Sequence, residues 1–227
     1  MKFAGFIKSS FVDYPNEISA VVFTSGCNFN CWYCHNQGLI NGKIQESEMI
    51  DEKEILDFLN KRKGLLDGLV ISGGEPTLHS DLKDFIRKVK KLGFKVKLDT
   101  NGTNPKLLQD LIDKRLIDFV AMDIKTTLEK YNDVIGKFSK IEDVKTSINI
   151  LMNSKIDYEF RTTFAPGISV EDIENIAKMI AGAKSYAIQK YNPQEEKIVK
   201  MPHSLSDFRF ANEVANKYVK CFLRSLD

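Results

Sequence analysis

The chain has 227 residues, 43% apolar and 28% charged, so it can bury a sizeable core and is too apolar to be disordered. Its 33 Lys and Arg residues nearly balance its 31 Asp and Glu residues, and a formal charge of +2 does not indicate a nucleic-acid partner. No apolar run is typical of a signal peptide or approaches the ~20 residues of a membrane span. We expect one cytoplasmic domain over residues 1–227, with no membrane partner.

Apolar, β-branched runs alternate with helix-like patterns along the chain. The runs predict strands at residues 18–25, 68–72, 95–99, 119–124, 158–164 and 186–191. The helix-like patterns predict helices at residues 51–63, 81–92, 105–114, 141–153, 170–181 and 205–219. In the second helix, four apolar residues share one face, Ser80 is a candidate N-cap and Gly93 a natural stop.

Six strand–helix units favour an α/β fold, with a parallel sheet and helices outside it. A full eight-unit barrel usually takes ~250 residues, so we expect a partial, laterally open (β/α)6 TIM-like barrel. A doubly wound open sheet is the alternative. Both architectures place ligands at the carboxyl ends of the strands. Polar residues and glycines lie at the ends of the predicted strands, at residues 25–36, 72–76, 99–102, 123–125 and 192, and the fifth strand carries Arg161.

Four cysteines are unevenly placed along the chain. Cys27, Cys31 and Cys34 lie within eight residues, so one short loop can wrap three thiolates around a single centre. Cys221 stands alone and is expected to be a packed thiol. Thiolates suit zinc or an iron–sulfur cluster in a reducing compartment. A closed zinc site needs four ligands, whereas three on a four-iron cluster leave one iron open. We favour the cluster, with zinc and three unliganded thiols as alternatives.

The spacing Cys27-x-x-x-Cys31-x-x-Cys34, with an aromatic residue before the last cysteine, resembles the signature of radical S-adenosylmethionine (SAM) enzymes. Residues 26–36 are most similar to glycyl-radical-enzyme activating enzymes. Residues 10–15 resemble the lead-in of the anaerobic ribonucleotide reductase activating proteins. The Gly-Gly-Glu-Pro and Asp-Thr-Asn-Gly runs follow in the order that the family shows.

This resemblance implies a [4Fe–4S] cluster bound by Cys27, Cys31 and Cys34, with SAM on the fourth iron. Reduction would cleave SAM to methionine and a 5′-deoxyadenosyl radical, which abstracts a hydrogen atom. The resemblance also implies SAM contacts from the strand ends, namely Tyr33, Gly73, Gly74, Glu75, Asp99, Thr100, Asn101, Asp123, Lys125, Arg161 and Asn192.

The residue types suit those contacts, and each has a structural alternative. Gly73 and Gly74 allow close backbone approach to a ligand, and Glu75 offers an anion to the SAM ammonium group; an ordinary turn with a solvated glutamate is the alternative. Tyr33 would lie against the adenine or serve as a packing aromatic. Residues 99–101 suit ribose or cation contacts, or form a simple turn.

Asp123 and Lys125 are two apart on a strand, so both point to one face. They resemble the family's Asp-x-Lys pair near the SAM carboxylate, and a purely structural ion pair is the alternative. Arg161 could bind the SAM carboxylate or ribose, or pair with Glu159. Asn192 falls where related enzymes carry a residue near the nucleoside.

These features predict a radical SAM activase that installs a glycyl radical on a partner enzyme, most like an anaerobic ribonucleotide reductase. A low-potential electron donor such as flavodoxin or ferredoxin is implied. The alternatives are a radical SAM enzyme acting on another glycyl radical enzyme or a small molecule, and a non-catalytic iron–sulfur or zinc protein. Six strand–helix units should leave the rim of the barrel open on one side. An open rim suits a substrate such as a flexible glycine-bearing loop of the partner enzyme.

Overall fold

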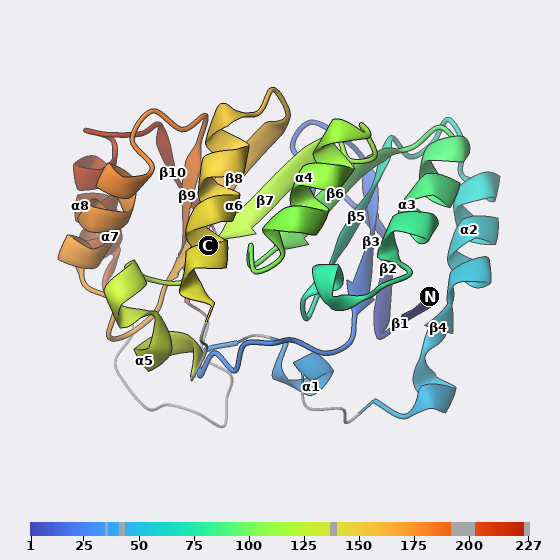
Figure 1. Ribbon diagram of the computed structural model, residues 1–227, viewed down its shortest axis with the longest axis horizontal. Helices are drawn as coiled ribbons and strands as arrows, with labels where there is room; N and C mark the ends of the chain where they lie inside the picture. The colour runs from blue at the N-terminus through green and yellow to red at the C-terminus, as the bar shows by residue number, and fades with distance from the viewer. Residues whose placement is uncertain (35, 41–43, 137–139, 192–202, 225–227) are drawn as a thin grey trace. The chain divides into compact units, whose positions relative to one another are not determined.

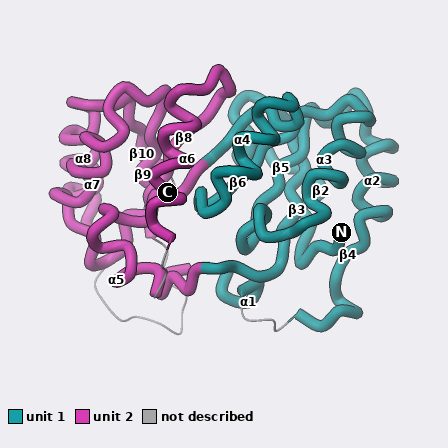
Figure 2. Tube along the Cα trace, in the orientation of Figure 1, with its two compact units in different colours: residues 1–28, 36–121 teal, residues 29–35, 122–227 magenta. Residues whose placement is uncertain are grey.

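The computed structural model describes residues 1–34, 36–40, 44–136, 140–191 and 203–224 (Figure 1). The chain divides into two compact units, coloured separately in Figure 2. The first unit comprises residues 1–28 and 36–121, and the second unit residues 29–35 and 122–227. The division assigns Cys27 to the first unit and both Cys31 and Cys34 to the second.

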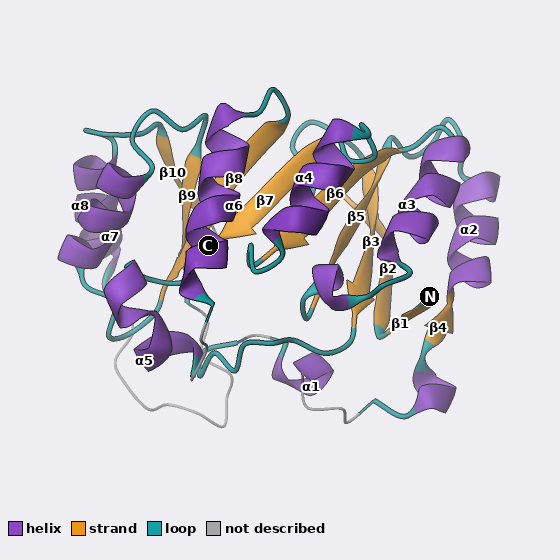
Figure 3. Ribbon diagram, in the orientation of Figure 1, coloured by secondary structure: helices purple, strands orange, loops and turns teal. Residues whose placement is uncertain are grey.

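The first unit is built on parallel strands with one antiparallel neighbour (Figure 3). β3 (Ser19–Thr24) pairs in parallel with β5 (Gly68–Gly73), which pairs in parallel with β6 (Lys95–Thr100). β2 (Gly5–Ser10) runs antiparallel beside β3. A separate ladder joins β1 (Lys2–Phe3) to β4 (Ile50–Asp51). Because β3, β5 and β6 are parallel, their carboxyl ends lie at one edge of the sheet.

The helices of the first unit follow its strands. They are α1 (Gln37–Ile40), α2 (Glu52–Lys61), α3 (Leu82–Lys91) and α4 (Pro105–Asp113), with 3-10 turns at Glu46–Glu48 and Pro76–Leu78. Asp51 caps α2 by accepting a hydrogen bond from Lys53 N, and Asn104 caps α4 with Pro105 at its first turn. α2 and α3 lie side by side in Figure 1.

The expected face of α3 is confirmed, but its expected cap is wrong. The four apolar residues predicted to share a face, Leu82, Phe85, Ile86 and Val89, are all fully buried. The N-cap position belongs to Asp81 rather than Ser80, and it makes no side-chain capping bond because its carboxylate pairs with the amino terminus at 3.1 Å. Gly93 follows the last turn with φ of +94°, as expected of a helix stop.

The second unit carries the remaining parallel strands. β7 (Phe119–Asp123) crosses the division between the units after Ala121. β8 (Asp157–Phe164) pairs in parallel with β9 (Tyr186–Lys190), and β9 with β10 (Cys221–Arg224). Its helices are α5 (Tyr131–Ile135), α6 (Ile141–Asn153), α7 (Val170–Met179) and α8 (Leu205–Ala215), with a 3-10 turn at Leu128–Lys130.

Capping boxes define the starts of α7 and α8. Ser169 and Ser204 each accept a hydrogen bond from the backbone nitrogen of the third helical residue, Asp172 or Asp207, whose carboxylate in turn accepts one from the cap nitrogen. α7 and α8 pack side by side within the second unit (Figure 1). Among the described residues, no helix combines the length and the apolarity needed to cross a membrane.

All six predicted strands and all six predicted helices are present, with ends shifted by up to four residues. Four strands, β1, β2, β4 and β10, were not predicted, and neither were the short helices α1 and α5. β2 was missed because its residues alternate poorly: Gly5 and the polar run at Lys8–Ser10 break the pattern of an edge strand.

Candidate functional site

In the first unit, three strands end beside the first cysteine. β3 runs into Cys27, β5 into Gly74 and Glu75, and β6 into Asn101. Two backbone hydrogen bonds join the ends of β3 and β5. They run from Gly74 N to Thr24 O (2.9 Å) and from Glu75 N to Gly26 O (2.8 Å). The predicted residues of the first unit therefore gather at one sheet edge, as parallel strands require.

The close backbone contact between these strand ends requires glycine at both Gly73 and Gly74. Gly73 has φ of +117°, and a methyl group there would lie 2.3 Å from Thr24 N. At Gly74 a methyl group would lie 1.8 Å from Gly26 O. The close approach expected of these glycines is thus made to the backbone of residues 23–26, which leads into Cys27 and the cysteine loop (residues 27–34).

Glu75 is buried, with 1% of its surface exposed, and its carboxylate accepts four hydrogen bonds. Oε1 accepts from Thr77 N (3.0 Å), Thr77 Oγ1 (2.5 Å) and Thr100 Oγ1 (2.8 Å), and Oε2 accepts from Asn101 N (2.6 Å). Burial raises the pKa of this carboxyl, although all these bonds act to lower it. The alternative of a solvated glutamate is therefore wrong. Glu75 joins the loops that follow β5 and β6 by accepting hydrogen bonds from both.

Asn101 links these hydrogen-bonded loops to the start of the cysteine loop. Its Nδ2 lies 2.8 Å from Asn28 Oδ1 and 3.9 Å from Cys27 Sγ. Thr103 donates to Asn101 Oδ1 from its nitrogen (3.1 Å) and its hydroxyl (2.7 Å). Asn28 and Thr103 were not singled out from the sequence; their positions beside Cys27 and the Asp-Thr-Asn-Gly run were the available signal.

Asp99 belongs to a second polar group, formed by side chains of β5 and β6. Its carboxylate accepts from Ser72 Oγ at 3.1 Å and from Lys97 Nζ at 2.7 Å. The Lys97 side chain is only 2% exposed and that of Asp99 13%, so this is a buried ion pair. Lys97 was not predicted, because a lysine two residues before an aspartate on a strand commonly faces solvent.

In the second unit, Asp123 joins two cations. Its Oδ2 accepts from Lys125 Nζ at 2.9 Å and its Oδ1 from Arg161 Nε at 2.8 Å. Burial alone would raise the pKa of Asp123, but Arg161 and Lys125 outweigh it and hold that pKa well below its ordinary value. The alternative pairing of Arg161 with Glu159 is wrong, because Glu159 binds Arg224 through two bonds of 2.7 Å.

Cys31, one of the other two cysteines, lies near this group. Cys34 N donates to Cys31 O at 3.1 Å, which closes a tight turn in the cysteine loop. Burial raises the pKa of the Cys31 thiol, while the nearby Lys125 lowers it. Tyr33, which is 5% exposed, donates from its hydroxyl to Lys125 O at 3.4 Å and meets the Trp32 ring edge-on.

The donor set fits an iron–sulfur cluster. Cys27, Cys31 and Cys34 are thiols that are not joined in disulfides. In the part of the chain that the structure describes, no three His, Cys, Asp or Glu side chains meet in one coordination sphere. A four-iron cluster does not require that, because each thiolate binds a different iron. Cys221, by contrast, is buried on β10, and burial raises its pKa to about 12.

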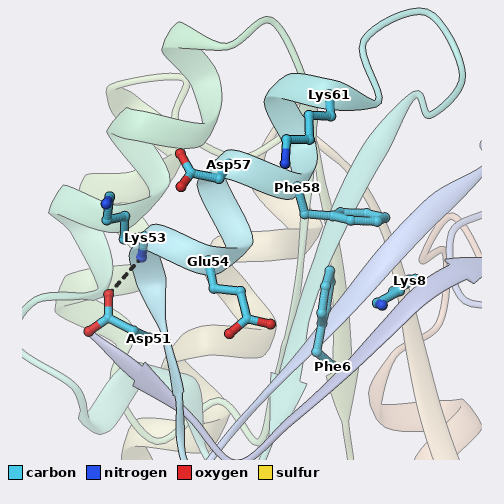
Figure 4. A pocket seen from close by; sticks show the side chains of 8 residues that line it. All are labelled: Phe6, Lys8, Asp51, Lys53, Glu54, Asp57, Phe58 and Lys61. Atoms are coloured by element: carbon cyan, nitrogen blue, oxygen red, sulfur yellow. Dashed lines mark hydrogen bonds between the residues drawn. The ribbon is translucent and has the colours of Figure 1, made fainter.

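Asn192, one of the predicted SAM contacts, falls outside the described residues. A pocket of about 520 Å³ lies between β2 and α2 of the first unit (Figure 4). Its lining contains none of the predicted site residues: Phe6, Lys8, Asp51, Lys53, Glu54, Asp57, Phe58 and Lys61.

Comparison with known proteins gives the class. Residues 21–180 match the radical SAM superfamily. A protein of Methanocaldococcus jannaschii named "Putative glycyl-radical enzyme activating enzyme" is 37% identical over 229 residues, covering 95% of this chain and 92% of that protein. A second protein of that organism, with the same descriptive name, is 32% identical over 91% of this chain and 80% of its own length. The chain therefore belongs to the radical SAM superfamily and is a radical SAM enzyme.

Solved structures give the same fold. SuiB of Streptococcus suis bound to S-adenosylmethionine aligns with a TM-score of 0.73 at 16% identity, covering 90% of this chain. The chain spans about half the length of SuiB, since the alignment covers 50% of it. A domain of pyruvate-formate lyase-activating enzyme from Bacteroides vulgatus aligns with a TM-score of 0.56 at 19% identity, over 70% of this chain and 99% of that domain. The expected fold class, the partial TIM-like barrel, is confirmed.

The expected cofactors follow from the family. Radical SAM enzymes carry a [4Fe–4S] cluster and SAM, and both are cofactors of this protein. The match to the superfamily runs through residues of both units, so it includes all three cysteines of the loop.

Proposed function

We propose that this protein is an activase that generates a glycyl radical on a partner enzyme, and that the partner is an anaerobic ribonucleotide reductase. The observation that carries the first part is the 37% identity to a named activating enzyme, which covers nearly the whole of both chains. The lead-in at residues 10–15 supports the second part. A low-potential donor, flavodoxin or ferredoxin, and a reducing cytoplasm complete the proposal.

In this proposal Cys27, Cys31 and Cys34 hold the cluster, and the polar strand ends hold SAM. When bound, the cluster and SAM supply a one-electron cleavage that gives methionine and a 5′-deoxyadenosyl radical, which abstracts a hydrogen atom. Arg161 and Lys125 provide positive charge for the SAM carboxylate, and Asp123 fixes both cations through bonds of 2.8 and 2.9 Å.

The remaining predicted contacts divide between binding and support. Tyr33, buried in the cysteine loop, would lie near the adenine, and the loop after β6 near the ribose. Glu75 holds that loop in place, since both of its oxygens accept hydrogen bonds from Thr77, Thr100 and Asn101. We therefore assign Glu75 to positioning of the site.

The test of cluster ligation is a set of single cysteine variants. Cys27→Ala, Cys31→Ala and Cys34→Ala should each lose the [4Fe–4S] signal and all formation of 5′-deoxyadenosine after anaerobic reconstitution, because each removes one of three thiolate ligands. Cys221→Ala should keep both, since Cys221 is buried on β10, away from the cysteine loop in sequence. Iron loss in Cys221→Ala equal to that in Cys31→Ala would contradict the proposed ligand set.

A further inference from the structure

The Asn101 side chain lies beside the first cysteine, within the first unit. Its Nδ2 is 3.9 Å from Cys27 Sγ, a donor–acceptor separation suited to sulfur, which is a larger acceptor than oxygen. Asn101 is buried, with 5% of its surface exposed, so water does not compete freely for its amide. The direction of its two protons decides whether this amide can donate a hydrogen bond to the Cys27 sulfur.

A closed ring of hydrogen bonds fixes the direction of the amide. Thr103 has one hydroxyl proton, and its Oγ1 lies 2.7 Å from Asn101 Oδ1 and 2.8 Å from Asn28 Nδ2. Asn28 Nδ2 can only donate, so the Thr103 proton goes to Asn101 Oδ1. Thr103 N donates to the same oxygen at 3.1 Å. The oxygen of Asn101 therefore faces Thr103, and its Nδ2 faces the cysteine loop.

The two protons of Nδ2 then have two acceptors. One goes to Asn28 Oδ1 at 2.8 Å, and the other faces Cys27 Sγ. The backbone is held as well, because Asn101 N donates to Glu75 Oε2 at 2.6 Å. The donor is thus pre-oriented toward the sulfur by groups in the loops that follow β5 and β6 and in the cysteine loop.

We propose that Asn101 is a positioning residue that donates an N–H···S hydrogen bond to the Cys27 thiolate and raises the reduction potential of the cluster. The inference rests on the proposed ligation by Cys27. Reduction adds negative charge to the cluster and its sulfurs, so a fixed donor stabilises the reduced state more than the oxidised state. Asn101 would thereby ease electron transfer from the physiological donor.

The test is a redox titration of the reconstituted protein, without SAM, monitored by EPR of the reduced cluster. Asn101→Leu removes the donor at similar side-chain size, and Asn101→Asp keeps an acceptor for Thr103 but loses the donor. Both should shift the midpoint potential to more negative values, the Asp variant further because it adds negative charge. An unchanged potential in Asn101→Leu with a full cluster would overturn the proposal.

Two further variants keep the test decisive. Thr103→Val removes the hydroxyl that orients the amide, so it should lower the potential by less than Asn101→Leu; if Asn101→Leu does not fold, an unchanged potential in both Thr103→Val and Asn101→Asp overturns the proposal. Asn104→Ala breaks the cap of α4 in the same loop without touching Cys27, so its potential should match the wild type. An equal drop in Asn104→Ala would assign the effect to loop disorder and refute a specific bond.

The same preparations separate this inference from the proposed function. Cys27→Ala should contain no intact cluster by iron and sulfide analysis. If Cys27→Ala keeps a full cluster, the ligand assignment itself fails. If Cys27→Ala loses the cluster while the Asn101 variants keep the wild-type potential, only the role of Asn101 fails.

Discussion

Charged side chains at the strand ends are matched by partners within each unit. Asp99 is paired with Lys97, and Asp123 with both Lys125 and Arg161. Unpaired charge at such partly buried positions would be costly, so these pairs hold the side chains of the proposed SAM site in fixed positions. A site that is ordered in advance loses less conformational entropy when it binds its ligand.

The Asp123 group makes a prediction about acid stability. A carboxyl whose pKa is depressed in the folded state contributes stability above its unfolded pKa of about 4, and this is lost as the pH falls toward the folded value. Asp123→Asn should therefore be less stable than the wild type at pH 7, by about 1–3 kcal/mol, and the gap should narrow below pH 4. Urea unfolding of both proteins between pH 2.5 and 7 measures this; a gap independent of pH would contradict the assignment.

Glu75 makes a prediction about stability rather than binding alone. Glu75→Ala leaves the donors on Thr77, Thr100 and Asn101 without their buried acceptor, and should lower the free energy of unfolding by at least ~2 kcal/mol. The exposed Glu129 provides a matched control, and Glu129→Ala should stay within about 0.5 kcal/mol of the wild type. Equal stabilities for the two variants in urea unfolding of the cluster-free protein would contradict a stabilising role for the Glu75 hydrogen bonds.

At the scale of elements, close backbone contact joins β3 to β5 just before the cysteine loop. The contact depends on Gly74, where any side chain would overlap Gly26 O. Gly74→Ala should therefore force the loop apart and lower the free energy of unfolding by at least ~2 kcal/mol. Gly38→Ala is the control, because a methyl group at Gly38 meets nothing within 4 Å. Thermal unfolding followed by circular dichroism would decide, and equal melting temperatures would contradict this account.

The sequence predicted the elements whose apolar pattern is strong. β3, β5 and α3 are buried in long apolar runs or on one full face, so periodicity alone identifies them. β10 was missed because its four residues sit next to α8, and a run that short does not separate strand from helix.

The site shows the same division. The three cysteines and the polar strand ends were predicted because each follows a strand in the chain. Contacts between distant segments could not be predicted, since Asn28 meets Asn101, and Arg224 meets Glu159, only through tertiary packing. Likewise, Glu75 was expected to face a ligand, and only the folded loops show four protein donors around it.

At the scale of the whole molecule, similarity in length to its relatives supports the activase proposal. This chain covers 92% of a named activating enzyme, whereas it covers 45% of a probable GTP 3′,8-cyclase of Saccharolobus solfataricus at 30% identity. A small-molecule enzyme of that kind has more than half of its length outside the match. The support for the activase proposal is thus the match over nearly the whole length of an activating enzyme.

The most direct test is to search for the radical on the partner. Reconstituted protein, reductant and SAM are mixed anaerobically with the candidate ribonucleotide reductase, and the mixture is examined by EPR. The account predicts a glycyl radical doublet on the reductase that is absent with Cys31→Ala. Absence of a doublet with the reductase and with every other glycyl radical enzyme of the same genome, while 5′-deoxyadenosine accumulates with a small metabolite, would contradict the account.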